Sequence, residues 1–157
     1  MRGLLIILAF TIASGVSFPV QALQTTVANS EVTEAQAARI VARVSISRQE
    51  IEIYHEGRKI YQWPVSTARQ GKITPVGTWN GAQWLSKNHR SSLYNGAPMP
   101  YAIFFNGNYA IHGTDQVKKL GRPASAGCVR LHPDNARILF NMVKAEGKPN
   151  LRVEVVR

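Results

Sequence analysis

The chain has 157 residues, of which 45% are hydrophobic, and this is the size and composition of one soluble domain rather than of two large ones. Nineteen Lys and Arg residues against nine Asp and Glu give a formal net charge of +10 at pH 7, which favours anionic surroundings. The basic residues stand singly or in pairs rather than in one cluster, so the sequence does not predict a nucleic-acid-binding protein.

The first 22 residues have the layout of a signal peptide. Arg2 supplies a positive start, residues 4–12 form an almost unbroken apolar run, and Val20-Gln21-Ala22 places small residues where a signal peptidase reads. A membrane anchor is the alternative, but the apolar run is short against about 30 Å of hydrocarbon. We therefore expect cleavage after Ala22, export to the periplasm or cell-wall space, and a soluble monomer.

The next segments predict a linker followed by strands. Residues 23–38 are polar and contain neither Lys nor Arg, so they are interpreted as a linker before a domain over residues 39–157. Apolar and polar side chains alternate over most of residues 40–53, and a period of two predicts strands. Glu56-Gly57-Arg58 predicts the turn of a hairpin whose next strand covers residues 59–65.

The middle of the sequence predicts one strand, one long loop and one hairpin. A strand-like run covers residues 78–85, and residues 86–100 are interpreted as a long loop of the kind that carries binding functions on a rigid sheet. Asn106-Gly107-Asn108 predicts a tight turn between strands over residues 101–105 and 109–112.

The last part of the sequence predicts one helix and one strand. The helix begins at Pro133 and ends at Gly147, and a strand over residues 151–156 follows it. The apolar residues at helical spacing are Ala136, Leu139, Phe140 and Val143. The order of elements predicts a mainly β domain with one late helix.

Cys128 is the only cysteine, so an exported protein offers it no disulfide partner. A lone cysteine is ordinarily a small inert core residue. Here Gly127 allows backbone to approach a substrate closely, and Arg130 adds a fixed positive charge. His112 ends a predicted strand and could take a proton from the thiol, so Cys128 is the candidate nucleophile and His112 its base.

Two segments resemble a known family. Ala110-Ile111-His112-Gly113-Thr114 and the run from Ser125 to Leu131 are similar to the HGT and S-x-G-C-[VI]-R-[LM] motifs of the L,D-transpeptidase catalytic domain, also called the YkuD family. The resemblance extends over about residues 40–156 in the family's order. Its further pieces are Pro64-Val65-Ser66-Thr67, Thr74-Pro75-Val76-Gly77-Thr78, Ala97-Pro98-Met99-Pro100-Tyr101 and Gly147. The fold class that this implies is a mainly β, mixed β-sandwich with one main late helix.

The resemblance implies a two-step acyl transfer on peptidoglycan stem peptides, without a cofactor. Cys128 would attack the bond between diaminopimelate and D-alanine of a tetrapeptide stem, form a thioester, and pass the acyl group to an amine. The amine belongs either to another stem, giving a 3-3 cross-link, or to the amino terminus of an outer-membrane protein. His112 would be the base, and the Gly113 carbonyl would orient it. Backbone amides near Gly127 would stabilise the oxyanion, and Arg130 would brace the nucleophile loop or meet a substrate carboxylate.

The resemblance also implies a substrate cleft. The residues expected to line it are Tyr94, Met99, Tyr109, Ser125 and, from the long loop, His89. Many family members have His directly before the Gly-Cys pair, whereas this chain has Ala126. Because the expected base, His112, is present, we expect activity to survive but the substrate pocket beside Ala126 to have a different shape.

Other interpretations remain open at this point. Cys128 and His132 have a spacing that could serve zinc, with His112 or His89 completing the site. Water as acceptor would make the protein an L,D-carboxypeptidase. A non-catalytic module could bind the cell wall or anionic lipid through charge alone. The three tryptophans are expected in the core or at its edge, with sugar stacking as the alternative.

Overall fold

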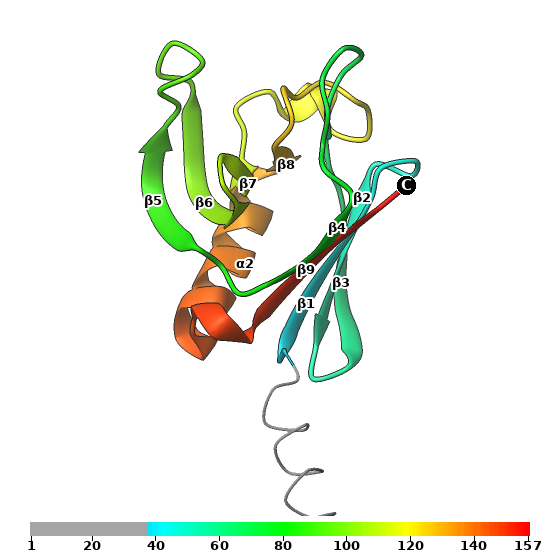
Figure 1. Cartoon of the computed structure of the whole chain (residues 1–157), viewed down its shortest axis with the longest axis vertical. Helices are drawn as coiled ribbons and strands as arrows, with labels where there is room; N and C mark the ends of the chain where they lie inside the picture. The colour runs from blue at the N-terminus through cyan, green and yellow to red at the C-terminus, as the bar shows by residue number, and fades with distance from the viewer. Residues whose placement is uncertain (1–37) are drawn as a thin grey trace, which may run out of the picture. The chain divides into compact units, whose positions relative to one another are not determined.

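The computed structural model describes residues 38–157, so the predicted signal peptide and all but the last residue of the predicted linker lie outside the described part. No helix within that part is long and apolar enough to cross a membrane. The described residues form two mixed β-sheets and one main α-helix (Figure 1). The expected fold class is thereby confirmed.

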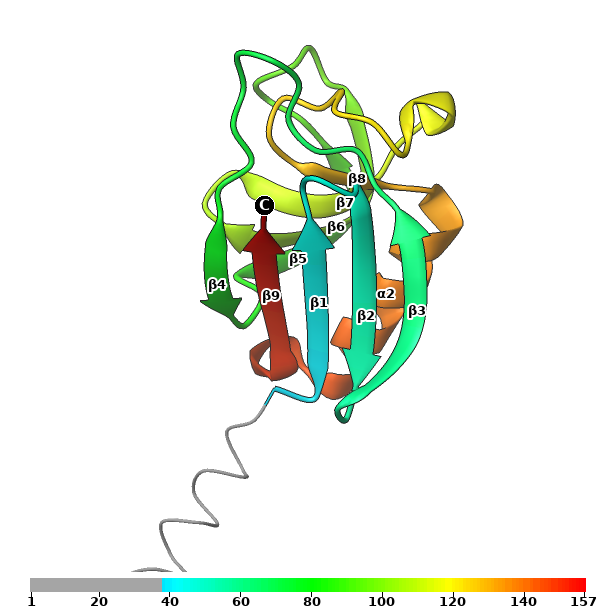
Figure 2. The same cartoon turned by 90° about the vertical axis from the view of Figure 1, so that its right-hand side faces the viewer.

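The larger sheet, sheet A, has five strands in the order β3-β2-β1-β9-β4 and faces the viewer in Figure 2. Its strands are β1 (Ile40–Ser45), β2 (Glu50–His55), β3 (Arg58–Pro64), β4 (Gly77–Asn80) and β9 (Leu151–Val156). The first and last strands pair in parallel, with Val44 beside Val155, while the other neighbours are antiparallel. The predicted hairpin between β2 and β3 is present and turns at Glu56-Gly57.

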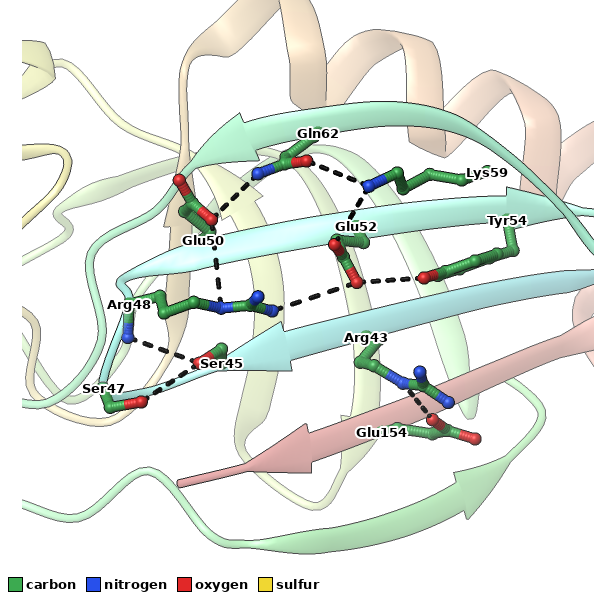
Figure 3. A network of polar contacts seen from close by, with 10 residues as sticks. All are labelled: Arg43, Ser45, Ser47, Arg48, Glu50, Glu52, Tyr54, Lys59, Gln62 and Glu154. Carbon is green, nitrogen blue, oxygen red and sulfur yellow. Dashed lines mark hydrogen bonds and ion pairs between the residues drawn. The ribbon is translucent and has the colours of Figure 1, made fainter.

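The two faces of sheet A differ because its strands alternate apolar and polar side chains. Residues such as Ile51 and Val153 are fully buried on the inner face. The outer face carries a network of paired charges, in which Arg43 binds Glu154 at 2.8 Å and Glu52 accepts from both Tyr54 and Lys59 (Figure 3). The inner face therefore contributes to the hydrophobic core, and the outer face carries polar contacts that are exposed to solvent.

The smaller sheet, sheet B, has four strands in the order β5-β6-β7-β8. They are β5 (Trp84–Arg90), β6 (Pro98–Asn106), β7 (Tyr109–Gly113) and β8 (Val129–Leu131). The predicted tight turn joins β6 to β7 at Gly107, whose φ of 52° suits glycine. Between β7 and β8 lies a short 3-10 helix, η1 (Val117–Lys119).

Helix α2 (Pro133–Glu146) packs against β6 and β7 and contributes to the same hydrophobic core as both sheets. His132 caps its first turn by accepting from the N–H of Asp134, and Gly147 ends it with a φ of 93°. Its buried residues are Ala136, Leu139, Phe140 and Val143, as the spacing predicts. A second 3-10 turn, η2 (Lys148–Asn150), leads into β9.

Two predictions about the middle of the chain are wrong. The run over residues 78–85 is not one strand, because Gly81, at a φ of 82°, separates β4 in sheet A from β5 in sheet B. The long loop over residues 86–100 is mostly strand, and only residues 91–97 lie between β5 and β6. β5 is an edge strand with mostly polar side chains, so it lacks the apolar alternation by which strands are recognised.

Candidate active site

Strand alternation brings Cys128 and His112 to one face of sheet B. β7 and β8 are parallel, and His112 pairs with Arg130. Ile111 and Val129 are fully buried in the main core. Because successive side chains alternate, His112, Arg130 and Cys128, which lies two residues before Arg130, all point to the opposite face.

That face forms the floor of a cleft of about 580 Å³. Four connections contribute to its lining, namely residues 65–76, 91–97, 107–108 and 114–128. The first, second and fourth of these lie at the same end in Figures 1 and 2. The residues that the sequence singled out and that line this cleft are His89, Tyr94, Met99, Tyr109, His112, Ser125, Cys128 and Arg130.

His112 is 5% exposed and is held by its own neighbour. Its Nδ1 lies 2.7 Å from the carbonyl oxygen of Gly113, which can only accept, so Nδ1 carries the proton and Nε2 has the free lone pair. Burial lowers the pKa of His112 to about 4, aided by the charges of Arg130 and His89 and opposed by the Gly113 hydrogen bond. The imidazole is therefore neutral at neutral pH, with one ring nitrogen able to accept a proton.

Gly113 cannot be replaced without displacing its surroundings. A Cβ built at this position would lie 3.1 Å from Pro100 Cγ and 3.1 Å from the Cα of Pro133. The missing side chain lets β6 and the start of α2 close around the backbone that holds His112.

Cys128 is half-buried in the cleft wall. Its thiol donates to the carbonyl oxygen of Asn108 at 3.6 Å. Among the hydrogen bonds of the described residues, none connects this thiol with His112. Burial raises the pKa of the thiol, while a backbone hydrogen bond at Ala110 and the charge of Arg130 oppose that shift. The side chain packs against Met99, Ala102, Phe104 and Ala110. At neutral pH the sulfur is therefore a neutral thiol, and it faces the same cleft as the neutral imidazole.

The loop before Cys128 is held in place by a glycine and two hydroxyl groups. Gly127 has a φ of 140°, and a Cβ there would come within 2.7 Å of Tyr109 and 2.8 Å of the Ile73 carbonyl oxygen. Its N–H donates to the Ser125 hydroxyl at 3.0 Å, and its carbonyl accepts from the Thr74 hydroxyl at 2.8 Å. Both polar groups of the Gly127 backbone are thus engaged within the loop.

Tyr101 has a backbone conformation that is rare for a large residue, with a φ of 56°. Its ring points into the core, where it packs against Phe140 of α2 at 5.8 Å between centroids. The irregularity shifts the alternation along β6, so that Met99 and Ala102, three residues apart, both face Cys128. The cleft floor therefore depends on this strained residue.

Two arginines reach the cleft from different segments. Arg130 donates to Gln116 at 3.2 Å, and burial lowers the pKa of its guanidinium. Arg69 donates to the carbonyl oxygen of Ser125 at 3.2 Å from the loop between β3 and β4. These contacts hold two positive charges at the edge of the cleft.

Charge is distributed unevenly over the described residues. Ion pairs take up every acidic residue of residues 38–157 except Asp115. The stretch between β3 and α2 contains Asp115 alone against eight basic residues, and none of these eight forms an ion pair within the described part. The eight are Arg69, Lys72, Lys87, Arg90, Lys118, Lys119, Arg122 and Arg130. Uncompensated positive charge is concentrated in the segments that build the cleft.

Sequence reasoning missed Arg69, Asn108 and Gln116. Arg69 enters the site because the preceding residue bridges to Ser125, a contact between distant segments that leaves no local pattern. Asn108 was identified only as a turn residue. His132, considered above as a metal ligand, caps α2 instead. Residues 38–157 contain no group of three His, Cys, Asp or Glu side chains placed to hold a metal ion.

Comparison with known proteins places the chain in a family. A "Probable L,D-transpeptidase YbiS" of Escherichia coli (strain K12) is 27% identical over 126 residues, which cover 64% of this chain but only 41% of that protein. An L,D-transpeptidase from Mycobacterium smegmatis has a similar fold, with a TM-score of 0.67 at 20% identity over 76% of this chain and 59% of the other. So does L,D-transpeptidase 3 from Mycobacterium tuberculosis in complex with a faropenem-derived adduct, with a TM-score of 0.65 at 18% identity over 76% and 60%. The model of the YkuD L,D-transpeptidase catalytic domain matches residues 39–155, and the chain therefore belongs to this family.

Proposed function

We propose that this protein is an exported L,D-transpeptidase that acts on peptidoglycan stem peptides, with Cys128 as nucleophile and His112 as base. The observation that carries the proposal is the arrangement on sheet B, where both side chains point into one cleft and His112 presents an unprotonated Nε2. Membership of the family supplies the substrate class.

Acylation would begin from the neutral pair. The thiol leaves the Asn108 carbonyl, turns toward His112, and transfers its proton to Nε2 as the sulfur attacks the carbonyl carbon of diaminopimelate. The C–N bond to D-alanine breaks, the leaving amine takes the proton from Nε2, and the stem remains on Cys128 as a thioester. Because His112 resists protonation, it gives the proton up readily to the leaving amine.

Deacylation would reverse these roles. An acceptor amine attacks the thioester, its proton passes to Nε2, and the C–S bond breaks to release the new amide. The proton then returns from His112 to the sulfur, so the enzyme ends as it began.

The backbone N–H of Cys128 is the proposed oxyanion donor. Of the backbone amides near Gly127, the N–H of Gly127 itself already donates to the Ser125 hydroxyl and is therefore not assigned this role. A single donor of this kind contributes about 3 kcal/mol in other acyl-transfer enzymes.

Arg69 and Arg130 are proposed to receive carboxylates of the stem peptide, which carries several. Their positions at the cleft edge and the absence of ion pairs to either within residues 38–157 support this assignment. The surrounding basic residues would raise the local concentration of anionic wall material and guide it toward the cleft.

A β-lactam probe tests the nucleophile. The protein is incubated with a penem, the class named in the adduct of the M. tuberculosis relative, or with a carbapenem, and is then weighed intact. We expect the wild type to gain the mass of one drug molecule and Cys128→Ser to gain none. A mass gain that survives in Cys128→Ser, or an unmodified wild type, would contradict the proposal and favour a binding module without catalysis.

The acceptor is decided by the products in the wall. Sacculi from cells with and without the protein are digested and analysed by mass spectrometry. Bonds between two diaminopimelates, wall-attached outer-membrane protein, or shortened stems would identify a second stem, a protein amine or water as the acceptor.

A further inference from the structure

A row of side chains leads from Cys128 across sheet B to an exposed tryptophan. Trp84 pairs with Phe104, Phe104 pairs with Ala110, and the β7–β8 register sets Ala110 beside Cys128. Phe104, Ala110 and Cys128 pack together on the cleft face, and the contact between Phe104 and Trp84 continues the row to the edge of the sheet.

Trp84 is held in a fixed orientation with one face open. Its ring stacks on Phe104 with centroids 3.7 Å apart and an interplanar angle of 4°. His89 stands edge-on to both rings, at 5.2 Å from Trp84 and 5.0 Å from Phe104. β5 is the edge strand, so the indole face opposite Phe104 looks away from the sheet, and the residue is 41% exposed.

The surroundings of Trp84 suit a flat, amphipathic ligand. The other exposed residues of the segment 83–88 are Gln83, Lys87 and Asn88, all polar, so Trp84 is the one exposed apolar side chain of this segment. A lipid tail or an apolar helix would need a contiguous apolar patch. A sugar ring has an apolar C–H face that packs on the electron-rich face of an indole, and hydroxyls around its rim.

The length of the row matches the length of a stem peptide. Three strand spacings of about 4.8 Å separate the Cα positions of Trp84 and Cys128 by about 14 Å. In a peptidoglycan stem, three residues connect the amino sugar to the carbonyl that the sulfur would attack. They span about 10–11 Å when extended, and the ether linkage on the sugar adds a few ångströms.

We propose that Trp84 is a stacking platform for the amino sugar that carries the donor stem. The inference rests on the proposed function and deepens it, because it makes the substrate a glycan-linked stem rather than a free peptide. Phe104 and His89 act as positioning residues that hold the indole upright.

The test compares two donors that differ only in the sugar, a free tetrapeptide stem and the same stem attached to its disaccharide. We expect kcat/KM of the wild type to be about fivefold higher for the disaccharide-linked stem, the scale of one aromatic contact. Trp84→Ala should remove this preference, Trp84→Phe should restore part of it, and Tyr61→Ala should leave it unchanged. Tyr61 is the matched control because it is 38% exposed and stacks on Trp63 in sheet A.

Each outcome decides the matter. Equal use of both donors by the wild type overturns the inference but leaves the proposed function standing. An equal loss for both donors in Trp84→Ala also overturns it, because such a loss reports damage to the cleft through Phe104. If neither donor is consumed, the proposed function fails. In that case, calorimetry measures the binding of both compounds to Cys128→Ala, which requires no turnover. Tighter binding of the disaccharide-linked stem supports the inference, and equal affinities of the two compounds overturn it.

Discussion

Acidification should destabilise this protein through His112. The pKa of the buried imidazole is about 4, whereas an unperturbed histidine has a pKa of 6.5. Between about pH 6.5 and about pH 4, His112 is protonated in the unfolded chain but not in the folded chain. The free energy of unfolding therefore falls as pH falls through this window, and this histidine does not change it above about pH 6.5. One pKa unit corresponds to about 1.4 kcal/mol, so the full loss is about 3 kcal/mol, of which about 2 kcal/mol is expected at about pH 5.

Urea unfolding at about pH 7 and about pH 5 measures this loss directly, with His112→Gln as the partner variant. Glutamine keeps an N–H for the Gly113 carbonyl but does not titrate, so the variant should lose about 2 kcal/mol less than the wild type between the two pH values. His132→Asn, which keeps a capping acceptor for α2, should lose as much as the wild type. Equal losses in the wild type and His112→Gln would refute the reasoning.

Further substitutions test how the loop that carries Cys128 is held. Gly127→Ala should lower the free energy of unfolding by about 2–4 kcal/mol and abolish labelling by a penem, because the added methyl overlaps Tyr109 at a strained φ. Thr74→Val removes the hydroxyl that donates to the Gly127 carbonyl. It should lower the free energy of unfolding by about 2 kcal/mol and slow labelling by the penem. Gln49→Leu should cost about 3 kcal/mol in urea unfolding, since three hydrogen bonds, two of them to Thr67, are lost, yet the folded fraction should label at the normal rate. Sedimentation with purified peptidoglycan should weaken as ionic strength rises from about 0.05 to about 0.5 M, and unchanged binding would argue against electrostatic guidance.

The strands and the helix that bury an apolar face could be predicted from the sequence because their periodicity is local. α2 is buried at the four predicted residues, and the tight turn between β6 and β7 follows from Gly107. β5 could not be recognised, because it is an edge strand with mostly polar side chains, none of them fully buried, and so has no apolar stripe. β8 is only three residues long, too short to show a period.

In the candidate site, too, some features could be predicted from local sequence motifs and others could not. The motifs identified His112 and Cys128, and the hydrogen bond expected between His112 and the Gly113 carbonyl is present. The resting contact of the thiol with Asn108 depends on a side-chain rotamer, which no motif encodes. The cation contributed by Arg69 depends on pairing between segments more than fifty residues apart.

Both faces of β7 and β8 are occupied, because one face packs in the core and the other faces the cleft. Ile111 and Val129 alternate along β7 and β8 with His112, Cys128 and Arg130, so a change of packing in the core is passed to the side chains that face the cleft. Removal of one methylene from either residue should cost only about 1 kcal/mol of stability, and we expect it to change the placement of His112 relative to Cys128. In a library of variants selected only for turnover, these two buried positions should therefore vary as little as those that meet the substrate.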